Sequence, residues 1–318
     1  MSKILITGGS GFIGTNVVEH FISNNYEVIN IDIVKPKIKK HKSYWLKGDI
    51  NDLFFLNKAT EEFNPEFIIH LAAKTDLNGK TLEDYKTNIR GVENLLSVSN
   101  NLGNLKKILI FSSMLVCKPG FIPVDQLQYR PSTVYGESKV LTEKIVWENV
   151  PKCDWAILRP TSIWGPWFDV PYKNFFDIIM KNKYFHIGSS GCTKTYGFVL
   201  NTVYQIDKIL LAKTTNKKNK VFYLGDHPPT NIETWANEIG TELNIKIKRM
   251  PFSLIKFAGY FGDFLNLIGL SFPMTSFRLK NMTTNNIVCL ENTSELAPVL
   301  PYTRIEGVKK TLIWIKEQ

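Results

Sequence analysis

The chain has few of the residues that build disulfides or metal sites. Its 318 residues include only four cysteines and five histidines, and the cysteines lie far apart at positions 117, 153, 192 and 289. No Cys-x-x-Cys motif or other metal-ligand spacing occurs. Scattered cysteines are typical of free thiols in a reducing compartment. We therefore expect a cytoplasmic protein that has no structural metal.

Long apolar runs are also missing. No uninterrupted apolar stretch reaches the ~18 residues of a transmembrane helix, and the first apolar run begins at Ile4, too early for the charged and apolar regions of a signal peptide. The most apolar part, Phe252–Phe272, is interrupted by Lys256, Asp263 and glycines. We interpret it as a buried helix, with a membrane-surface role as the alternative, and expect no stable membrane insertion.

The composition is that of an ordinary globular protein with an excess of positive charge. Hydrophobic residues make up 44% and charged residues 21%, and the net charge is +10. The length fits one large domain or two unequal ones. Most of the charge is expected on solvated surfaces, and part of it would attract an anionic small substrate. No nucleic-acid-binding motif accompanies the charge, so no nucleic-acid partner is expected.

The N-terminal segment has the pattern of a dinucleotide-binding turn. An apolar strand, Lys3–Thr7, leads directly into Gly8, Gly9, Gly11 and Gly14, and a helical pattern follows. Such glycines turn tightly from strand to helix, let a pyrophosphate approach the backbone and allow close helix–strand packing. The helix N-terminus then offers free N–H groups to the phosphates. The sequence therefore predicts a dinucleotide site here.

The next predicted strand, Glu27–Asp32, ends in a carboxylate about twenty residues past the glycines. A carboxylate at this position accepts hydrogen bonds from the adenosine ribose and repels a 2′-phosphate, which favours NAD over NADP. The alternative is a capping or turn aspartate. Lys35 and Lys37 lie close enough to weaken the distinction between the two cofactors.

A tyrosine and a lysine four residues apart suggest a proton-transfer device. Tyr135 and Lys139 would share one helix face, and the ammonium would lower the phenol pKa from its usual ~10 toward that of a general base. The same spacing recurs at Tyr204 and Lys208, so the pattern alone does not choose between the pairs.

The surroundings favour the first pair. Ser113 follows the apolar run Lys107–Phe111, which reads as a buried strand, and nothing similar precedes Tyr204. Open α/β sheets bind ligands at the carboxyl ends of their strands. We therefore predict that the hydroxyl of Ser113 works together with Tyr135 and Lys139.

Strand and helix patterns alternate through the first half of the chain. This alternation predicts an α/β fold with a doubly wound parallel sheet, the Rossmann arrangement. We expect an NAD-binding domain at residues 1–166, joined by a returning strand near 221–226, and a smaller, mostly substrate-binding lobe at 167–318. An aromatic cluster after Gly165-Pro166 is interpreted either as core or as the wall of a substrate cleft.

The combined motifs resemble the extended short-chain dehydrogenase/reductase family, in its NAD-dependent nucleotide-sugar epimerase/dehydratase branch. The resemblance runs along nearly the whole chain. It rests on Thr7–Gly14, Asp32, Gly48-Asp49-Ile50, His70–Ala73, Asn88–Leu96, Ser112-Ser113, Tyr135 with Lys139, and Arg159-Pro160 with Gly165-Pro166.

The resemblance implies a role for each matching position. Tyr135 would be the acid/base, Ser113 would hydrogen-bond the same sugar oxygen, and Lys139 would hold the nicotinamide ribose. The substrate would contact Ser113, Ser162, Asn174 and Lys194. The implied cofactor-binding residues are Gly8, Gly11, Phe12, Ile13, Gly14, Asp32, Asp49, Ile50, Leu71, Ala72, Ala73, Asn88, Tyr135 and Lys139.

The chain departs from the family at informative places. Met114 and Leu115 stand where the 4,6-dehydratases carry an Asp-Glu pair, and neither can move a proton, which argues against dehydration. Ser162 stands where 4-epimerases of UDP-galactose often have asparagine. Lys194 replaces an arginine, so it can pair with a phosphate but without a bidentate fork.

These observations predict an NAD-dependent nucleoside-diphosphate-sugar epimerase, with C4 as the preferred carbon, that acts through a transient keto sugar. The resemblance further implies a homodimer and a role in polysaccharide biosynthesis. A 4-keto-sugar reductase or dehydrogenase remains the alternative enzyme. A non-catalytic NAD(H)-responsive protein and an enzyme for a steroid-like alcohol also remain open.

Overall fold

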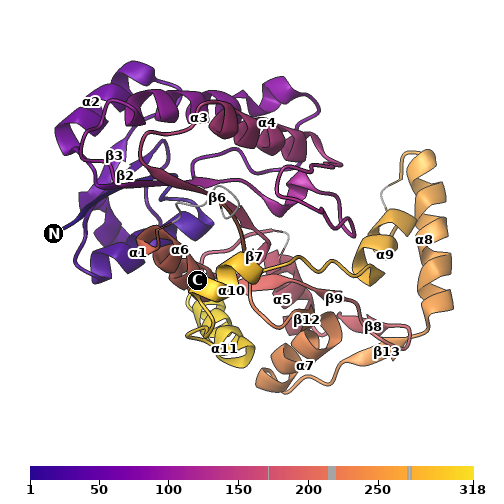
Figure 1. Ribbon diagram of the computed structural model, residues 1–318. Helices are drawn as coiled ribbons and strands as arrows, with labels where there is room; N and C mark the ends of the chain where they lie inside the picture. Colours follow the sequence, from indigo (N-terminus) through magenta and orange to yellow (C-terminus); the bar gives the residue numbers. More distant parts are fainter. Residues whose placement is uncertain (171, 214–219, 271, 273) are drawn as a thin grey trace.

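The architecture is known from a computed structural model that describes residues 1–170, 172–213, 220–270, 272 and 274–318. Its centre is a seven-stranded sheet in the order β11-β6-β5-β4-β1-β2-β3 (Figure 1). Every neighbouring pair of these strands is parallel. The strands are β1 (Lys3–Thr7), β2 (Glu27–Asp32), β3 (Trp45–Lys47), β4 (Phe67–His70), β5 (Lys107–Phe111), β6 (Asp154–Pro160) and β11 (Val221–Leu224).

The strand order confirms the predicted doubly wound fold. The chain runs from β1 outward to β3, then crosses to β4 on the other side of β1 and continues to β6. This reversal creates a switch point between β1 and β4, where such folds bind ligands. The predicted returning strand is also confirmed, because β11 pairs with β6 from Val221 opposite Ile157.

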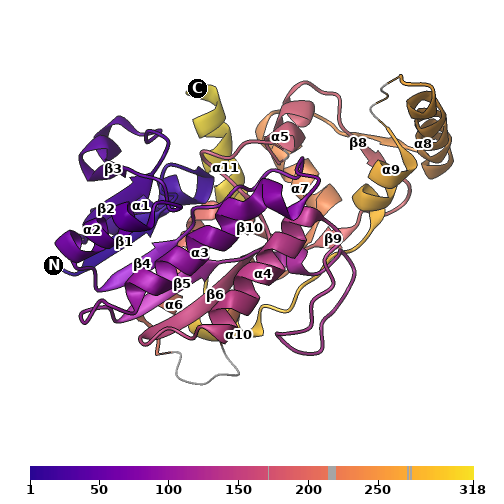
Figure 2. The ribbon, with the colours of Figure 1, turned by 90° about the horizontal axis from the view of Figure 1, so that it is seen from above.

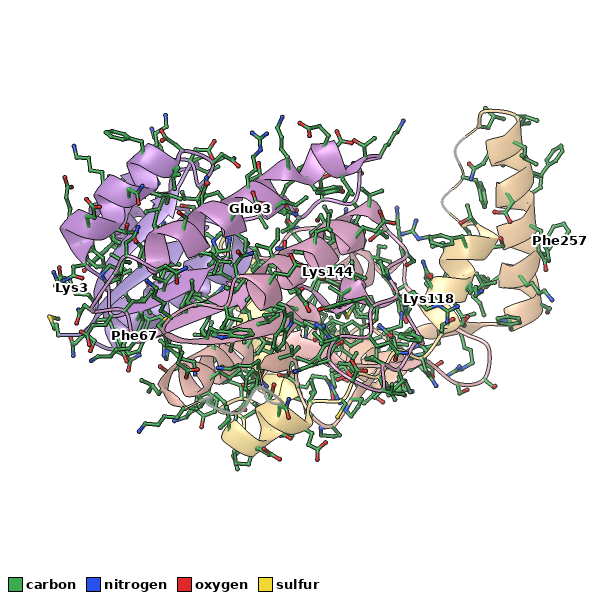
Figure 3. All side chains as sticks on the ribbon, turned by 45° about the horizontal axis from the view of Figure 1, so that its top comes forward. Lys3, Phe67, Glu93, Lys118, Lys144 and Phe257 are labelled. Atoms are coloured by element: carbon green, nitrogen blue, oxygen red, sulfur yellow. The ribbon has the colours of Figure 1, made fainter. Side chains whose placement is uncertain are left out.

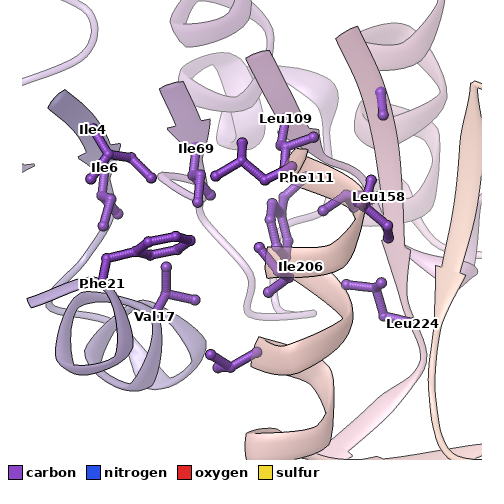
Figure 4. Close-up of a cluster of buried hydrophobic side chains, with 14 of the residues drawn as sticks. Ile4, Ile6, Val17, Phe21, Ile69, Leu109, Phe111, Leu158, Ile206 and Leu224 are labelled. Atoms are coloured by element: carbon purple, nitrogen blue, oxygen red, sulfur yellow. The ribbon is translucent and has the colours of Figure 1, made fainter. Parts of the chain in front are cut away.

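Helices cover both faces of the sheet (Figure 2). On one face lie α2 (Leu53–Phe63), α3 (Lys86–Ser99) and α4 (Val134–Glu148), and on the other α1 (Phe12–Ser23) and α6 (Val199–Leu211). Buried strands with few polar residues are expected when a parallel sheet is covered on both faces. Figure 4 shows the core between the sheet and helices α1 and α6, where Phe21 of α1 and Ile206 of α6 pack against Ile6 and Leu109 of the sheet.

The C-terminal part of the chain builds a smaller lobe around an aromatic core. Trp164 and Trp235 are almost fully buried, with ring centroids 4.9 Å apart, and Phe176 and Phe198 pack against them. Within the predicted aromatic cluster, Trp164, Phe168 and Phe176 therefore belong to the core. The lobe contains β7 (Ser162–Trp164), α5 (Tyr172–Met180), β8 (Phe185–Ile187), β9 (Thr193–Lys194), β10 (Tyr196–Phe198), β12 (Thr230–Asn231), α7 (Ile232–Glu242), β13 (Lys248–Met250), α9 (Ser276–Thr283) and α11 (Arg304–Lys316). Helix α10 (Glu291–Leu296) instead packs against β11 and α6 of the sheet domain.

The interpretation of the most apolar stretch as a buried helix was wrong. It forms α8 (Phe252–Leu267), which stands at the edge of the molecule beside α9 (Figures 1 and 2). Only Ile255, Gly259 and Gly262 of this helix are buried, because α9 covers one face and leaves the other open. Across the described ranges, no helix combines the length and apolarity needed to cross a membrane.

Candidate active site

In the glycine turn after β1, a Cβ at Gly8, Gly9 or Gly14 would clash with its neighbours. Gly8 has φ +74°, and a Cβ there would lie 2.5 Å from the backbone nitrogen of Ala72. A Cβ at Gly14 would lie 2.2 Å from the carbonyl oxygen of Gly8. At Gly11 a Cβ would meet only that same oxygen, at 3.3 Å. The turn is therefore packed on its inner side and open above Gly11, where a pyrophosphate would approach.

Helix α1 begins at this opening. Gly11 is its N-cap and no side chain caps it, so the first N–H groups of the helix, those of Phe12 and Ile13 among them, have no side-chain partner. Unpaired N–H groups and the positive end of the helix dipole favour a bound phosphate. The donor set therefore fits the dinucleotide predicted from the sequence.

Asp32 is held against the glycine turn. Its carboxylate accepts a hydrogen bond from the backbone N–H of Ser10 at 2.9 Å and another from Val34 at 2.9 Å. A carboxylate fixed at the end of β2 has the position expected for a ribose ligand. The ammonium of Lys37, which could have favoured a 2′-phosphate, donates to the carbonyl oxygen of Trp167 at 3.1 Å.

The segment after β4 forms the opposite wall of the turn. The N–H of Leu71 donates to the Thr7 carbonyl at 3.0 Å, which places Ala72 against Gly8. The His70 ring is hydrogen-bonded to the Thr7 hydroxyl at 2.7 Å, and burial, with a smaller effect of Lys139, lowers its pKa to about 3. His70 is thus a neutral structural histidine beside the predicted cofactor wall Leu71–Ala73.

The other predicted cofactor residues hold local structure. Asp49 accepts hydrogen bonds from Asn51, and Ile50 is buried against α3 at Gly91. The amide of Asn88 donates to the Lys74 carbonyl and to the Ser138 hydroxyl, and its oxygen accepts from the Lys74 N–H. Asn88 therefore positions the end of the Leu71–Ala73 wall relative to α4.

The three predicted catalytic side chains meet at the carboxyl end of β5. Ser113 and Tyr135 are both only 8% exposed, and the Ser113 hydroxyl, which accepts a hydrogen bond from the Leu115 N–H at 3.1 Å, lies close enough to Tyr135 to affect its pKa. Lys139 lies one helical turn after Tyr135 on α4, where its ammonium donates to the Phe111 carbonyl at 2.9 Å. Tyr204 and Lys208 instead lie on α6, with the ammonium 5.0 Å from the centre of the Tyr204 ring.

The pKa of Tyr135 differs from the prediction. Burial raises it to about 12, the Ser113 hydroxyl lowers it by less, and Tyr85 raises it slightly. Burial also lowers the pKa of Lys139 to about 8, against a smaller opposite effect of Glu143. The predicted lowering of the tyrosine pKa was wrong, because burial of the phenol raises it and Lys139, whose ammonium donates to the Phe111 carbonyl, is not among the groups that shift it.

A buried ion pair under the catalytic residues was missed from the sequence. Glu143 and Arg159 are both fully buried and form a bidentate pair at 2.6 and 2.8 Å. The Ser112 hydroxyl donates to the same carboxylate at 2.5 Å. Because Tyr135, Lys139 and Glu143 recur every four residues, the sequence did contain a sign that Glu143 shares their face.

A pocket of about 250 Å³ lies in the smaller lobe. It is lined by aromatic residues, among them Tyr172, Phe175 and Trp235, and by the cations Lys194 and Arg278. Of the residues predicted to bind substrate, Lys194 lies in this wall, and its ammonium donates to the Asn281 carbonyl at 2.6 Å. Arg278 was not predicted, because nothing near it in the sequence marks a site.

The other two residues predicted to bind the substrate in this lobe, Ser162 and Asn174, do not line the pocket among the described residues. The hydroxyl of Ser162 accepts a hydrogen bond from Tyr172 at 2.6 Å, so it orients a residue of the pocket wall. Asn174 is exposed on α5 and is not among the described residues that line the pocket. Asn286 links the two parts of the site, because it pairs with Lys194 and its amide approaches the Met114 sulfur at 4.0 Å.

Comparisons with known proteins agree with this geometry. An undecaprenyl-diphosphate N-acetylglucosamine 4-epimerase of Escherichia coli O157:H7 is 27% identical over 98% of this chain and 94% of its own length. A decarboxylating sterol-4-alpha-carboxylate 3-dehydrogenase of Saccharomyces cerevisiae is 25% identical over 100% of this chain and 99% of its own. The crystal structure of UDP-glucose 4-epimerase from Thermotoga maritima superimposes with a TM-score of 0.75 at 21% identity, covering 99% of each chain.

Family membership follows from a match over most of the chain. Residues 4–220 match the profile of the NAD dependent epimerase/dehydratase family. The matched range contains the glycine turn, Asp32, and the Ser113, Tyr135 and Lys139 cluster. The chain therefore belongs to the NAD dependent epimerase/dehydratase family and is an enzyme that works with NAD.

Proposed function

We propose that the protein is a 4-epimerase that acts on a sugar carried by a diphosphate, in the first place a nucleoside-diphosphate sugar. The observation that carries the proposal is the meeting of Ser113, Tyr135 and Lys139 at the end of β5. The glycine turn that fits NAD follows β1 of the same parallel sheet, and the smaller lobe has a pocket that is lined in part by cationic side chains.

The residues divide the chemistry between them. Tyr135 accepts the proton of the C4 hydroxyl and later returns it, while the Ser113 hydroxyl hydrogen-bonds the same oxygen. Lys139, whose pKa burial lowers to about 8, can pass on a proton near neutral pH one helical turn from Tyr135. NAD, which the glycine turn and Asp32 would hold, would supply the hydride chemistry at C4.

Dehydration lacks the acid that it needs. Met114 and Leu115 follow the catalytic serine, and neither side chain can move a proton. Glu143, the carboxylate beneath this cluster, is fully engaged by Arg159 and Ser112. Epimerisation needs only the hydroxyl proton to move, which the existing trio can do.

Cations in the pocket support a diphosphate-linked substrate. Lys194 and Arg278 lie on the same pocket wall as Tyr172 and Phe175, which offer apolar faces to a base or a sugar. The Thermotoga maritima structure is described as a complex with UDP-glucose. A UDP-sugar is therefore the first substrate to test.

A second candidate substrate is a sugar diphosphate carried on a lipid. A groove of about 260 Å³ lies between α8 and α9 and is lined by Phe252, Tyr260 and Lys280 among others. Thr283 lines both this groove and the pocket, so the two are neighbours. A groove that combines apolar rings with lysines, next to a cationic pocket, could take part of a polyprenyl chain, and the related E. coli enzyme is named for an undecaprenyl-linked substrate.

We further propose that the protein is a cytoplasmic homodimer that serves polysaccharide biosynthesis. Helices α3 and α4 pack together on the outside of the sheet, where they could form a four-helix bundle with a second copy (Figure 2). All four cysteines are free, which agrees with a reducing compartment.

One assay separates an epimerase from a reductase. An epimerase returns the hydride that it removes, so a new sugar signal in the NMR spectrum should grow while the absorbance at 340 nm stays flat without added NADH. Consumption of NADH in proportion to product would identify a reductase. Parallel reactions with UDP-N-acetylglucosamine and with its polyprenyl-diphosphate counterpart show which carrier the enzyme accepts. Clean NAD binding without turnover of either would favour a non-catalytic protein.

A further inference from the structure

Helix α8 carries a continuous exposed stripe of large apolar residues. The stripe, called here the α8 stripe, consists of Leu254, Phe257, Phe261, Phe264 and Ile268, each three or four positions after the one before it, so that all lie on one side of the helix. Phe257 is 71% exposed and Phe264 57% exposed. Figure 3 shows Phe257 pointing away from the protein. Such a contiguous exposed patch marks an interaction surface.

The opposite face of α8 explains why the stripe is turned outward. A Cβ at Gly262 would come within 1.8 Å of the Met274 carbonyl oxygen, and one at Gly259 would lie 3.3 Å from the Ser276 nitrogen. The chain leading into α9 therefore packs closely on the small residues of α8. Asp263, the only acidic residue of α8, accepts a hydrogen bond from the Ser276 N–H at 3.2 Å. The fold thus turns the small residues inward and the large apolar residues outward.

The surroundings of the α8 stripe are strongly basic. Residues 244–283 contain six lysines and arginines and a single acidic residue, Asp263. Lys256 and Lys280 line the groove between α8 and α9. Arg249 is the member of this set that is ion-paired with Glu233. An apolar stripe flanked by positive charge is the pattern of a helix that lies in the interface of an anionic bilayer.

We propose that the α8–α9 hairpin docks the protein on the surface of an anionic lipid bilayer, with the α8 stripe in the headgroup region and the basic residues against lipid phosphates. Helix α8 has 16 residues, fewer than the ~20 that a span needs. A second copy of the chain is the less suitable occupant, because it would bring two basic surfaces together, whereas anionic lipids are complementary to them.

Docking would place the pocket near the membrane. Helix α9 separates the groove from the pocket and contributes Arg278 and Thr283 to the pocket wall. An enzyme held in this way meets a sugar diphosphate at the bilayer surface. The docking itself goes beyond the proposed function, because it requires no turnover and would occur with either carrier.

Vesicle co-sedimentation tests the docking directly. We expect the full-length protein to bind vesicles of phosphatidylcholine with 30% phosphatidylglycerol and to bind pure phosphatidylcholine much less, with a loss at high salt. The variant Phe257→Gln/Phe264→Gln leaves the charge unchanged and should weaken binding by about tenfold for each ring removed. Lys256→Gln/Lys280→Gln should weaken binding to the anionic vesicles and reduce its salt dependence.

The matched control is Phe54→Gln, since Phe54 is 81% exposed and belongs to α2, which lies at the other end of the molecule from α8 (Figure 1). It should bind vesicles as the unsubstituted protein does, and NAD binding should be the same in all variants, which shows that they are folded. The proposal is overturned if the unsubstituted protein binds neither kind of vesicle, or if Phe54→Gln weakens binding as much as Phe257→Gln/Phe264→Gln does. It is also overturned if the α8 stripe instead holds together a dimer that Phe257→Gln/Phe264→Gln dissociates.

Discussion

Removing the charge of Glu143 is expected to destabilise the protein and to lower the pKa of Lys139 at the same time. The substitution Glu143→Gln keeps the size of the side chain but leaves the guanidinium of Arg159 without its carboxylate. Both side chains are fully buried, so water cannot replace the lost charge. The Ser112 hydroxyl also loses a charged acceptor.

The magnitude follows from what remains around Arg159. Breaking one side of a buried ion pair costs about 3–5 kcal/mol, because the partner stays buried and uncompensated. The guanidinium still donates to the Tyr223 hydroxyl and the Gln126 carbonyl, and the rings of Tyr129 and Tyr223 lie 5.5 and 5.3 Å away. These remaining contacts partly compensate the guanidinium, so we expect the free energy of unfolding to decrease by about 3 kcal/mol, the lower end of that range.

Urea denaturation of the cofactor-free protein measures this loss. The control is Glu62→Gln, since Glu62 faces Lys58 at 3.8 Å on an exposed helix surface and should cost at most ~0.5 kcal/mol. The double variant Glu143→Leu/Arg159→Met should recover much of the stability, because no charge is then buried alone. A loss below ~1 kcal/mol for Glu143→Gln, or a double variant no better than the single, would refute the reasoning.

The same substitution has a functional readout. The Glu143 carboxylate raises the pKa of Lys139, so its removal should lower that pKa further below its present value of about 8. The limb of the pH–rate profile that follows Lys139 should then move to lower pH. A purely structural ion pair would lower the stability and leave the profile in place.

Three further outcomes are expected. Tyr135→Phe should keep the fold and NAD binding but lower turnover by ~10²–10⁴ in the NMR assay, and an equal loss in Tyr204→Phe would show that the wrong tyrosine was chosen. Asp32→Ala should weaken NAD binding in a fluorescence titration and reduce the difference in affinity between NAD and NADP. Tighter binding of NADP than of NAD by the unsubstituted protein would contradict the prediction that Asp32 binds the adenosine ribose. The pKa of His70 is about 3 in the folded protein and 6.5 when unfolded, so the folded state binds fewer protons between these values. Stability should therefore fall by up to roughly 1.4 kcal/mol per pH unit as the pH drops below 6.5, and His70→Asn should flatten this slope in thermal melts.

The sequence alone was sufficient wherever the physical requirement is local. The glycine turn could be predicted because a tight strand-to-helix turn needs residues without a Cβ, and the structure shows contacts of 2.5 and 2.2 Å for an added Cβ at Gly8 and Gly14. Tyr135 and Lys139 could be placed on one helix face by their spacing, and Ser113 at a strand end by the apolar run before it. The alternation of strands and helices likewise predicted the parallel sheet.

Properties that depend on distant residues were decided only by the tertiary structure. The pKa of Tyr135 is set by burial in packed surroundings, which no spacing reveals. Glu143 pairs with Arg159, which lies sixteen residues later in the sequence on a different element. Arg278 lines the same pocket as Lys194, although more than eighty residues separate them in the sequence. An apolar helix is buried only if another element covers it, and α8 has α9 on one face alone. The sequence thus determined the glycine turn and the shared helix face of Tyr135 and Lys139, whereas long-range packing determined their electrostatics, the pocket and the exposed face of α8.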